Sequence, residues 1–440
     1  MRKYFTMMMM AVASLCLTAC GDDAPVGSPV SVGTVVVSLQ GVSGDMSNIE
    51  ITLRGNSTFT AKADKDGKAT FNVTTGIYEA IASGSYAING TFYKANGTGG
   101  QVVVQANQTI NVGIAMKEAK SSQVIIKEIY NGGCPSNDGK TYQFDKCIIL
   151  YNNSDQQAEL SNLCIATCSP GNAHAMNKDY DENGRLVYES QGFTPAQHGM
   201  WWFQDKLTIA PYSQVVVNVC GAIDNTLTVS QSVNYANADY YCMYDPESGY
   251  NLTSYYPTPA DVIPTSHYLL ASKFGQGTAW MLSQSSPAFF IYQNRQGTPA
   301  EYAQDPDNLW YGVGEQQTPV NACIRIPVEW ILDGMEVFDA NRVEDSKKRL
   351  TADVDGGYVA LTNKLGHTLY RNVDKEATEA LPENAGKLVY GYTLGVGNST
   401  DPSGIDAEAS IKKGAHIVYL DTNNSTADFH ERQKFSVRGE

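Results

Sequence analysis

The sequence predicts an all-β protein built from β-sandwich domains, with an N-terminal spacer sandwich followed by a larger β region. Short runs of β-branched and aromatic residues alternate with Gly, Asp and Asn turn signals from about residue 32 onward. Tyrosine is abundant, at 26 residues, and strands favour this residue type. A hydrophobic content of 42% is ordinary for a folded chain with a sizeable core.

The chain begins with the pattern of a secretory signal. Arg2 and Lys3 precede an apolar run over residues 7–17 and small residues before Cys20, which are the parts of a signal peptide. The apolar run is much shorter than the roughly 20 residues that span a bilayer. We therefore expect residues 1–19 to be a signal peptide and residues 20–31 to be a modified cysteine followed by a short tether.

The residues around Cys20 also resemble two known signals. Leu-Thr-Ala-Cys at positions 17–20 resembles the bacterial lipobox, which implies that Cys20 is acylated, for example with palmitate, and anchors the protein to a membrane. The following Gly-Asp-Asp resembles the acidic signal of surface-exposed lipoproteins of the Bacteroidetes. Together they imply a lipid-anchored protein of the outer membrane that faces the medium. The alternative is an ordinary secreted protein with a chance cysteine.

The net charge restricts the class of partner. A formal charge of −15 argues against nucleic acid and against electrostatic binding to anionic lipid. It is compatible with a soluble surface protein or with cationic ligands.

Residues 32–118 have the pattern of the spacer sandwich. Apolar or alternating strands are expected at residues 35–39, 49–53, 69–73, 78–82, 102–104 and 110–114. The stretch from Thr60 to Phe71, with its Asp-Lys-Asp-Gly turn, and the following Gly-Ile-Tyr at 76–78 resemble the carboxypeptidase regulatory-like or Cna-B-type domain. Such domains usually act as spacers. Asp64 and Asp66 are expected to shape the turn, with calcium binding as the alternative.

A second unit is expected over residues 120–440. Its opening runs, residues 123–131, 147–155 and 158–163, resemble the lamin-tail domain, which is an immunoglobulin-like β-sandwich. Further strings at 326–338, 353–360 and 421–432, taken with the lipobox and the first domain, resemble the DUF4876 family of Bacteroidetes lipoproteins. That family is named for its unknown function. Its members are often encoded beside TonB-dependent outer-membrane transporters, which implies nutrient capture or docking on such a transporter.

Seven cysteines follow Cys20, and an oxidising compartment would allow disulfides among them. The odd number leaves at least one thiol without an intramolecular partner, and the pairing is not readable from the sequence. Cys164 and Cys168 near His174 could form a metal site, but a disulfide or buried thiols are favoured because no second close pair accompanies them. The seven are Cys134, Cys147, Cys164, Cys168, Cys220, Cys242 and Cys323.

Asp179, Asp181 and Asn183 match the first half of a calcium loop, with oxygens at alternate positions and Gly184 at the turn. The twelfth position is Ser190 rather than glutamate. A hairpin with a type I′ Asn-Gly turn explains the same residues. No cofactor is therefore assigned, and calcium stays an alternative to the hairpin here.

The densest aromatic stretch supplies the candidate contact residues. Proline and glycine interrupt it after residue 235, so we expect loops rather than strands there. Exposed rings on such loops stack on ligands or anchor protein interfaces, whereas the alternative is that they cap a core. The candidates are Trp201, Trp202, Tyr240, Tyr241, Tyr244, Tyr255 and Tyr256.

Catalytic motifs are lacking in the sequence. There is no Gly-x-Ser-x-Gly, no His-Glu-x-x-His and no Gly-rich phosphate loop, so no catalytic residue is assigned. The expected function is non-enzymatic ligand binding or transporter docking. The alternatives are a structural or adhesive surface protein and a surface hydrolase. A hydrolase requires a pocket in which a histidine bonds a nucleophile and a carboxylate. A binding module requires an exposed aromatic patch or a concave groove. An adhesin requires broad flat faces and no pocket.

Overall fold

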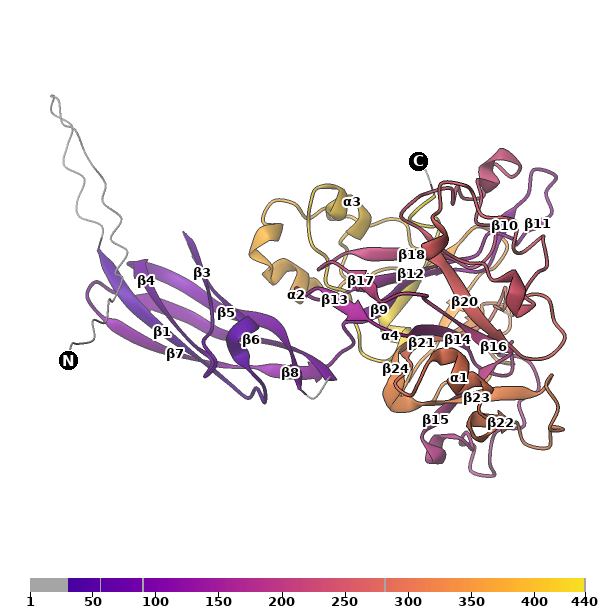
Figure 1. The fold of residues 1–440 in the computed structure, drawn as a ribbon. Helices are drawn as coiled ribbons and strands as arrows, with labels where there is room; N and C mark the ends of the chain where they lie inside the picture. The colour runs from indigo at the N-terminus through magenta and orange to yellow at the C-terminus, as the bar shows by residue number, and fades with distance from the viewer. Residues whose placement is uncertain (1–30, 56, 89–90, 281, 439–440) are drawn as a thin grey trace, which may run out of the picture.

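The computed structural model describes residues 31–438, except residues 56, 89–90 and 281 (Figure 1). The expected signal peptide and Cys20 lie outside the described residues. The described chain consists mainly of β-strands with four short α-helices, so the predicted all-β class is confirmed. No described helix is long and apolar enough to cross a membrane. The helices are α1 (Pro299–Gln304), α2 (Lys375–Ala380), α3 (Ala407–Lys412) and α4 (Ser425–Asp428).

The first part of the described chain forms a sandwich of two sheets, here called the N-terminal sandwich. One sheet has the order β4-β1-β7 and the other the order β3-β2-β5-β6-β8. Alternate residues of β1 point inward, so that Val35, Val37 and Leu39 are buried in a core made only of residues from this sandwich. The strands are β1 (Val32–Gln40), β2 (Glu50–Arg54), β3 (Thr58–Lys62), β4 (Lys68–Thr74), β5 (Gly76–Ile88), β6 (Thr91–Val104), β7 (Thr109–Ala115) and β8 (Lys117–Lys120).

The local chemistry of this sandwich follows the sequence closely. The Asp64 carboxylate accepts hydrogen bonds from the backbone N–H groups of Asp66 and Lys68, and Gly67 has a positive φ of 75°, so the predicted turn is confirmed. The β5–β6 hairpin is longer than the apolar pattern predicts. In its far half Gly84 pairs with Ala95 and Tyr86 pairs with Tyr93, and Tyr86 and Ala95 extend the core of the sandwich.

The larger region, residues 123–438, is organised around a twelve-stranded sheet. Two-stranded sheets β13-β17 and β10-β11 and the three-stranded sheet β15-β23-β22 complete it. In sheet order the twelve strands are β25 (Val359–Leu361), β24 (Ile331–Asp339), β21 (Ala288–Gln293), β14 (Leu163–Thr167), β16 (Gly199–Trp202), β20 (Tyr268–Lys273), β19 (Tyr241–Met243), β18 (Gln214–Asn218), β12 (Cys147–Asn152), β9 (Val124–Tyr130), β26 (Thr368–Arg371) and β27 (Phe429–Arg432). The others are β10 (Cys134–Pro135), β11 (Thr141–Tyr142), β13 (Ala158–Leu160), β15 (Phe193–Gln197), β17 (Leu207–Ile209), β22 (Leu309–Tyr311) and β23 (Ala322–Pro327).

This long sheet folds over its own core. The Asp333 carboxylate of β24 accepts a hydrogen bond from the backbone N–H of Ile126 in β9, although seven strands separate β24 and β9 in the sheet order. Ile126 and Met335 belong to the same buried cluster. The outer face of β9 and β12 is covered as well, because a second cluster joins Ile125 to residues of the C-terminal segment 373–419. Every residue of β9 and β12 is therefore buried.

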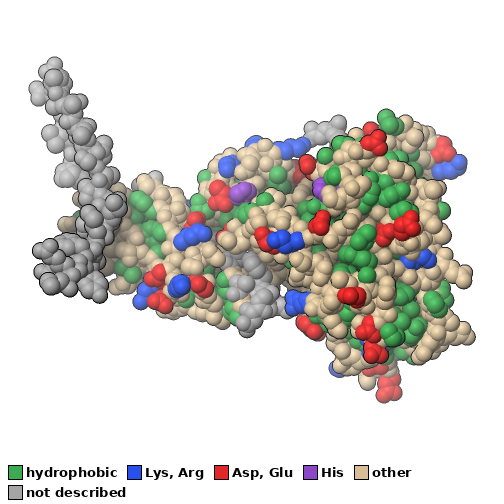
Figure 2. Space-filling model, in the orientation of Figure 1, with side chains coloured by type: hydrophobic (Ala, Val, Ile, Leu, Met, Phe, Trp, Pro, Cys, Tyr) green, Lys and Arg blue, Asp and Glu red, His purple; other side chains and the backbone are tan. Residues whose placement is uncertain are grey.

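The N-terminal sandwich touches the larger region at α2. The Arg54 guanidinium donates a hydrogen bond of 3.1 Å to the backbone carbonyl of Glu379 at the end of that helix. Figure 1 shows α2 and α3 on the side of the larger region that faces the sandwich. On the face drawn in Figure 2, charged side chains are scattered over the larger region, and no patch of one sign dominates that face.

Two buried ion pairs fix segments of the larger region that are distant in sequence. Arg349 and Glu336 are fully buried at a nitrogen–oxygen distance of 2.5 Å, and Arg371 pairs with Asp333. The other Glu336 oxygen accepts the backbone N–H groups of Arg349 and Leu350. Removing one partner of such a pair leaves an uncompensated buried charge.

We predict that Glu336→Gln lowers the free energy of unfolding of the larger region by about 3–5 kcal/mol, because the Arg349 charge loses its partner. Glu159→Gln is the matched control, since the Lys206–Glu159 pair is about half exposed and its loss should cost less than about 1 kcal/mol. Urea unfolding followed by tryptophan fluorescence measures both, because all five tryptophans lie in the larger region. Equal losses in the two variants would contradict the argument.

Candidate functional site

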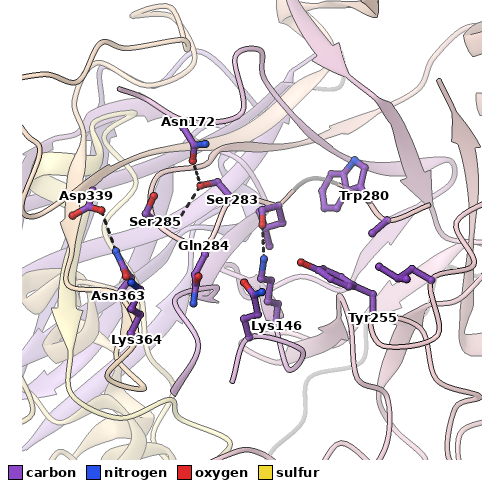
Figure 3. A pocket seen from close by; sticks show the side chains of 14 residues that line it. Lys146, Asn172, Tyr255, Trp280, Ser283, Gln284, Ser285, Asp339, Asn363 and Lys364 are labelled. Carbon is purple, nitrogen blue, oxygen red and sulfur yellow. Dashed lines mark hydrogen bonds between the residues drawn. The ribbon is translucent and has the colours of Figure 1, made fainter. Parts of the chain in front are cut away.

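A cavity of about 520 Å³ lies where several strands of the larger region begin or end. Gln143 and Lys146 precede β12, residues 279–280 and 282–285 lie before β21, Asp339 ends β24, and Asn363 and Lys364 follow β25. Figure 3 shows these side chains around one hollow, with Tyr255 and Trp280 on one side. We call it the Lys146 cavity.

Lys146 is the unusual group of this cavity. Its side chain is buried, yet among the residues that the structure describes its ammonium bonds only the backbone carbonyl of Leu282, at 2.5 Å, and it lies 5.7 Å from the centre of the Tyr255 ring. Within the described residues, no carboxylate lies within 4.0 Å of its Nζ. Burial lowers the pKa of Lys146, and the neighbouring Cys220 and Asp145 act in the opposite direction.

Asp145, the next residue in sequence, faces away from the cavity into a polar cluster. Its Oδ2 accepts hydrogen bonds from Ser232 at 2.6 Å and Tyr130 at 3.1 Å. Burial raises the pKa of Asp145 to about 6. The carboxylate therefore does not neutralise Lys146 directly.

Amide side chains supply most of the remaining polar wall. The Asn172 carbonyl oxygen accepts a 2.5 Å hydrogen bond from Ser283, Gln284 donates to the backbone carbonyl of Gly132 at 2.8 Å, and Asn363 donates to Asp339 at 3.1 Å. Each of these three amides thus uses one end to hold its position, as Figure 3 shows for Asn172 and Asn363. The other end of each is available to a ligand, and an amide offers both donor and acceptor groups.

The structure places the predicted aromatic contacts in two environments. Trp201, Trp202 and Tyr256 are buried, so the expectation that they form an exposed contact surface is wrong. The physical reason is the position of β16 between β14 and β20 inside the sheet, which sends Trp201 and Trp202 into different cores. Trp201 stacks on Tyr250 with ring centres 5.3 Å apart.

The other four predicted rings are half-buried. The ring of Tyr241 stacks on that of His267 with the ring centres 4.1 Å apart. The ring of Tyr244 packs edge-on against that of Tyr268 with the ring centres 5.4 Å apart. The His267 ring also contacts the backbone carbonyl of Tyr240. Only Tyr255 lines the Lys146 cavity. The alternative, that the aromatic stretch caps a core, therefore describes most of these residues.

The candidate calcium loop folds as a hairpin. The Asp181 carboxylate accepts the backbone N–H groups of Asn183 and Arg185, and Tyr180 pairs with Leu186. Gly184 has a φ of 73°, but Asn183 does not have a positive φ. A type I′ turn requires a positive φ at both residues, so the type I′ turn that the sequence suggests is not formed. Asp179 lies apart from the turn, where it accepts the backbone N–H of Val313. The calcium assignment of Asp179, Asp181 and Asn183 stays a prediction.

The seven cysteines after Cys20 are all buried and all have free thiols, so no disulfide forms among them. The described residues contain no group of three or more His, Cys, Asp or Glu side chains that could hold a metal ion. Cys164 and Cys168 instead belong to a hydrophobic core.

No hydrolase arrangement surrounds the histidines that the structure describes. His367 bonds Glu431 at 2.7 Å, and His430 lies between Asn372 and Tyr392. Burial lowers the pKa of His430 to about 3, with Arg432 acting in the same direction. None of the described histidine rings bonds a serine, threonine or cysteine side chain.

Sequence reasoning missed Lys146 and the amides. The one local signal for Lys146 is its position directly before the fully apolar run 147–151, where a strand is about to enter the core. The sequence contains no pattern that points to Asn172, Gln284 and Asn363 as cavity residues, because they come from distant segments that only the folded sheet brings together.

We predict that the difference in free energy of unfolding between Lys146→Met and the natural chain changes as the pH becomes alkaline. The pKa of Lys146 is lowered on folding, so burying its charge costs the natural chain free energy at neutral pH. This cost disappears as the pH rises toward the ordinary value of 10.5. Urea unfolding at a series of pH values should therefore show the natural chain gaining stability relative to Lys146→Met. Lys413→Met, at an exposed position, controls for loss of a lysine, and parallel curves for Lys146→Met and the natural chain would contradict the argument.

Comparisons with known proteins identify the family. A family model described as a protein of unknown function, DUF4876, matches residues 210–436, which is more than half of the chain. A crystal structure of a DUF4876 family protein from Bacteroides thetaiotaomicron is similar in fold, with a TM-score of 0.64 and 18% sequence identity over 90% of this chain and 94% of that one. No curated protein matches. The chain belongs to the DUF4876 family, whose function is unknown.

Proposed function

We propose that this protein is a lipid-anchored binding protein of the cell surface that captures a small, hydroxylated, carboxylate-bearing ligand in the Lys146 cavity. The observation that carries the proposal is a buried ammonium on the wall of an open polar cavity, to which none of the described carboxylates is paired. A buried charge is costly unless it is paired, so an anionic ligand group would be favoured beside Lys146.

The rest of the wall suits hydroxyl groups. Asn172, Gln284 and Asn363 each have one amide end held by the protein, and the free ends offer donors and acceptors to a ligand. The half-buried ring of Tyr255 adds an apolar surface. A cavity of about 520 Å³ is within the usual range for small-molecule sites, about 300–1,000 Å³. A sugar acid combines the carboxylate, the hydroxyls and the size that this wall would accept.

Binding is favoured over hydrolysis by the surroundings of the cavity. Its described lining contains no histidine and no cysteine, and its serines hold structural positions, such as the Ser283 bond to Asn172. A hydrolytic site would require a base directed at a nucleophile. Docking on a TonB-dependent transporter is the second part of the proposal, and the family resemblance supports it.

Isothermal titration of the mature chain with glucuronate and glucose tests the ligand class. These sugars differ only in the carboxylate, so we expect glucuronate to bind at least about tenfold more tightly. Lys146→Met should remove this preference, whereas Lys413→Met should keep it. Equal binding of both sugars, or an unchanged preference in Lys146→Met, would contradict the proposed site.

A separate experiment tests the anchor and the partner. We expect the chain expressed in its native membrane to incorporate an alkyne-labelled palmitate and to be cleaved by protease added to intact cells. Cys20→Ser should lose the label and leave the membrane fraction. Affinity purification of the lipidated chain should recover a TonB-dependent transporter. Labelling that persists in Cys20→Ser would overturn the assignment of the anchor.

A further inference from the structure

A second cavity, of about 400 Å³, lies on another part of the larger region and shares no lining residue with the Lys146 cavity. Its walls come from the segment 169–179 after β14, the end of β15, and the loop between β22 and β23. It therefore carries an inference separate from the proposed function. We call it the Asp179 cavity.

Asp179 gives this cavity a buried carboxylate with a vacant oxygen. The side chain is 6% exposed, and its Oδ1 accepts a 2.8 Å hydrogen bond from the backbone N–H of Val313. Within the part of the chain that the structure describes, Oδ2 has no hydrogen-bond donor and no cation pairs with it. The nearest lysine in sequence, Lys178, forms its ion pair with Glu315 at 3.3 Å instead. A ligand ammonium would supply the missing donor and the missing charge.

Two amide donors on the same wall have no acceptor among the described residues. Gln197 is 4% exposed, and its buried Nε2 has no partner in that part of the chain. Asn177 uses its carbonyl oxygen to accept the backbone N–H of Asp179 at 2.9 Å, which leaves its buried Nδ2 without a partner. Buried donors are normally satisfied, so two vacant ones beside a cavity indicate that an acceptor, such as a carbonyl oxygen, belongs there.

The rim of the cavity is apolar. Met176, Val313 and Val320 all line it, and they are 83%, 47% and 55% exposed. Large apolar side chains that are exposed together around a hollow mark a binding surface more often than scattered ones do. They would cover an apolar group of the ligand.

We propose that the Asp179 cavity binds an α-ammonium group with an adjacent carbonyl and an apolar side chain, as at the amino end of a short peptide or in a free apolar amino acid. The ammonium pairs with Asp179, the carbonyl accepts from Gln197 or Asn177, and the side chain lies against the rim. Each part of this ligand satisfies a group that the protein leaves vacant.

Isothermal titration of the full mature chain, with EDTA present to exclude calcium-mediated binding, tests the ligand class. We expect L-leucinamide to bind, N-acetyl-L-leucinamide to bind at least about tenfold more weakly because it lacks the ammonium, and glycinamide to bind more weakly because it lacks the apolar group. Failure of L-leucinamide to bind, or equal binding of the acetylated form, overturns the proposal.

Titration with free L-leucine and with a leucyl dipeptide shows whether the natural ligand is a free amino acid or the amino end of a peptide. Equal binding of both supports a site for amino acids and peptide ends alike, whereas preference for the dipeptide supports a site for peptide ends.

Variants then locate the site. Asp179→Asn removes the charge but keeps an acceptor for the Val313 N–H, and it should weaken L-leucinamide binding by at least about tenfold. Asp181→Asn, in the exposed turn of the same hairpin, is the matched control and should bind normally. Val320→Lys places a repelling cation on the exposed rim, where folding does not depend on the side chain, and should also weaken binding. Unchanged binding in both Asp179→Asn and Val320→Lys overturns the proposal.

Discussion

The larger region depends on how two adjacent charged residues in the middle of β9 are paired. Lys127 and Glu128 are fully buried in a strand that is covered on both faces. Lys127 pairs with Glu408 of α3 at 2.6 Å, and Glu128 lies 3.7 Å from Arg432 of β27. Both partners come from the last part of the described chain. The first strand of the larger region therefore cannot be buried without the C-terminal segment, because each unpaired charge would cost too much.

A β-bulge makes this arrangement geometrically consistent. The register of β9 with β12 shifts between Ile149 and Leu150, so that Lys127 has no direct partner in that ladder. The extra residue resets the alternation of side chains. Lys127 and Glu128 both face the C-terminal segment, while Ile126 and Ile129 on either side face the apolar core. The same closure of the sheet brings the strand ends around the Lys146 cavity together.

The sequence predicts the strands well where hydrophobicity alone decides the structure. The runs at 35–39, 69–73 and 147–151 lie in the strands β1, β4 and β12, because a sheet buries their apolar side chains. The aromatic stretch shows the limit of this reasoning. The sequence of Trp201 and Trp202 suits an exposed loop or a buried strand equally, and the choice depends on β14 and β20, which lie far away in the chain. Lys146 and its amides were unpredictable for the same reason, since their proximity follows from sheet closure.

The free thiols have a consequence for how the chain reaches its folded state. Burial raises the pKa of Cys134 to about 11 and that of Cys164 to about 12, so neither thiol forms much nucleophilic thiolate at neutral pH once folded. The unfolded chain lacks this shielding, and a disulfide between any two of these cysteines would be incompatible with a fold in which all seven remain reduced. Under oxidising conditions, folding of the sheet would therefore compete with oxidation of the thiols, and rapid burial of the sulfurs would itself protect the chain against scrambled, aggregation-prone products.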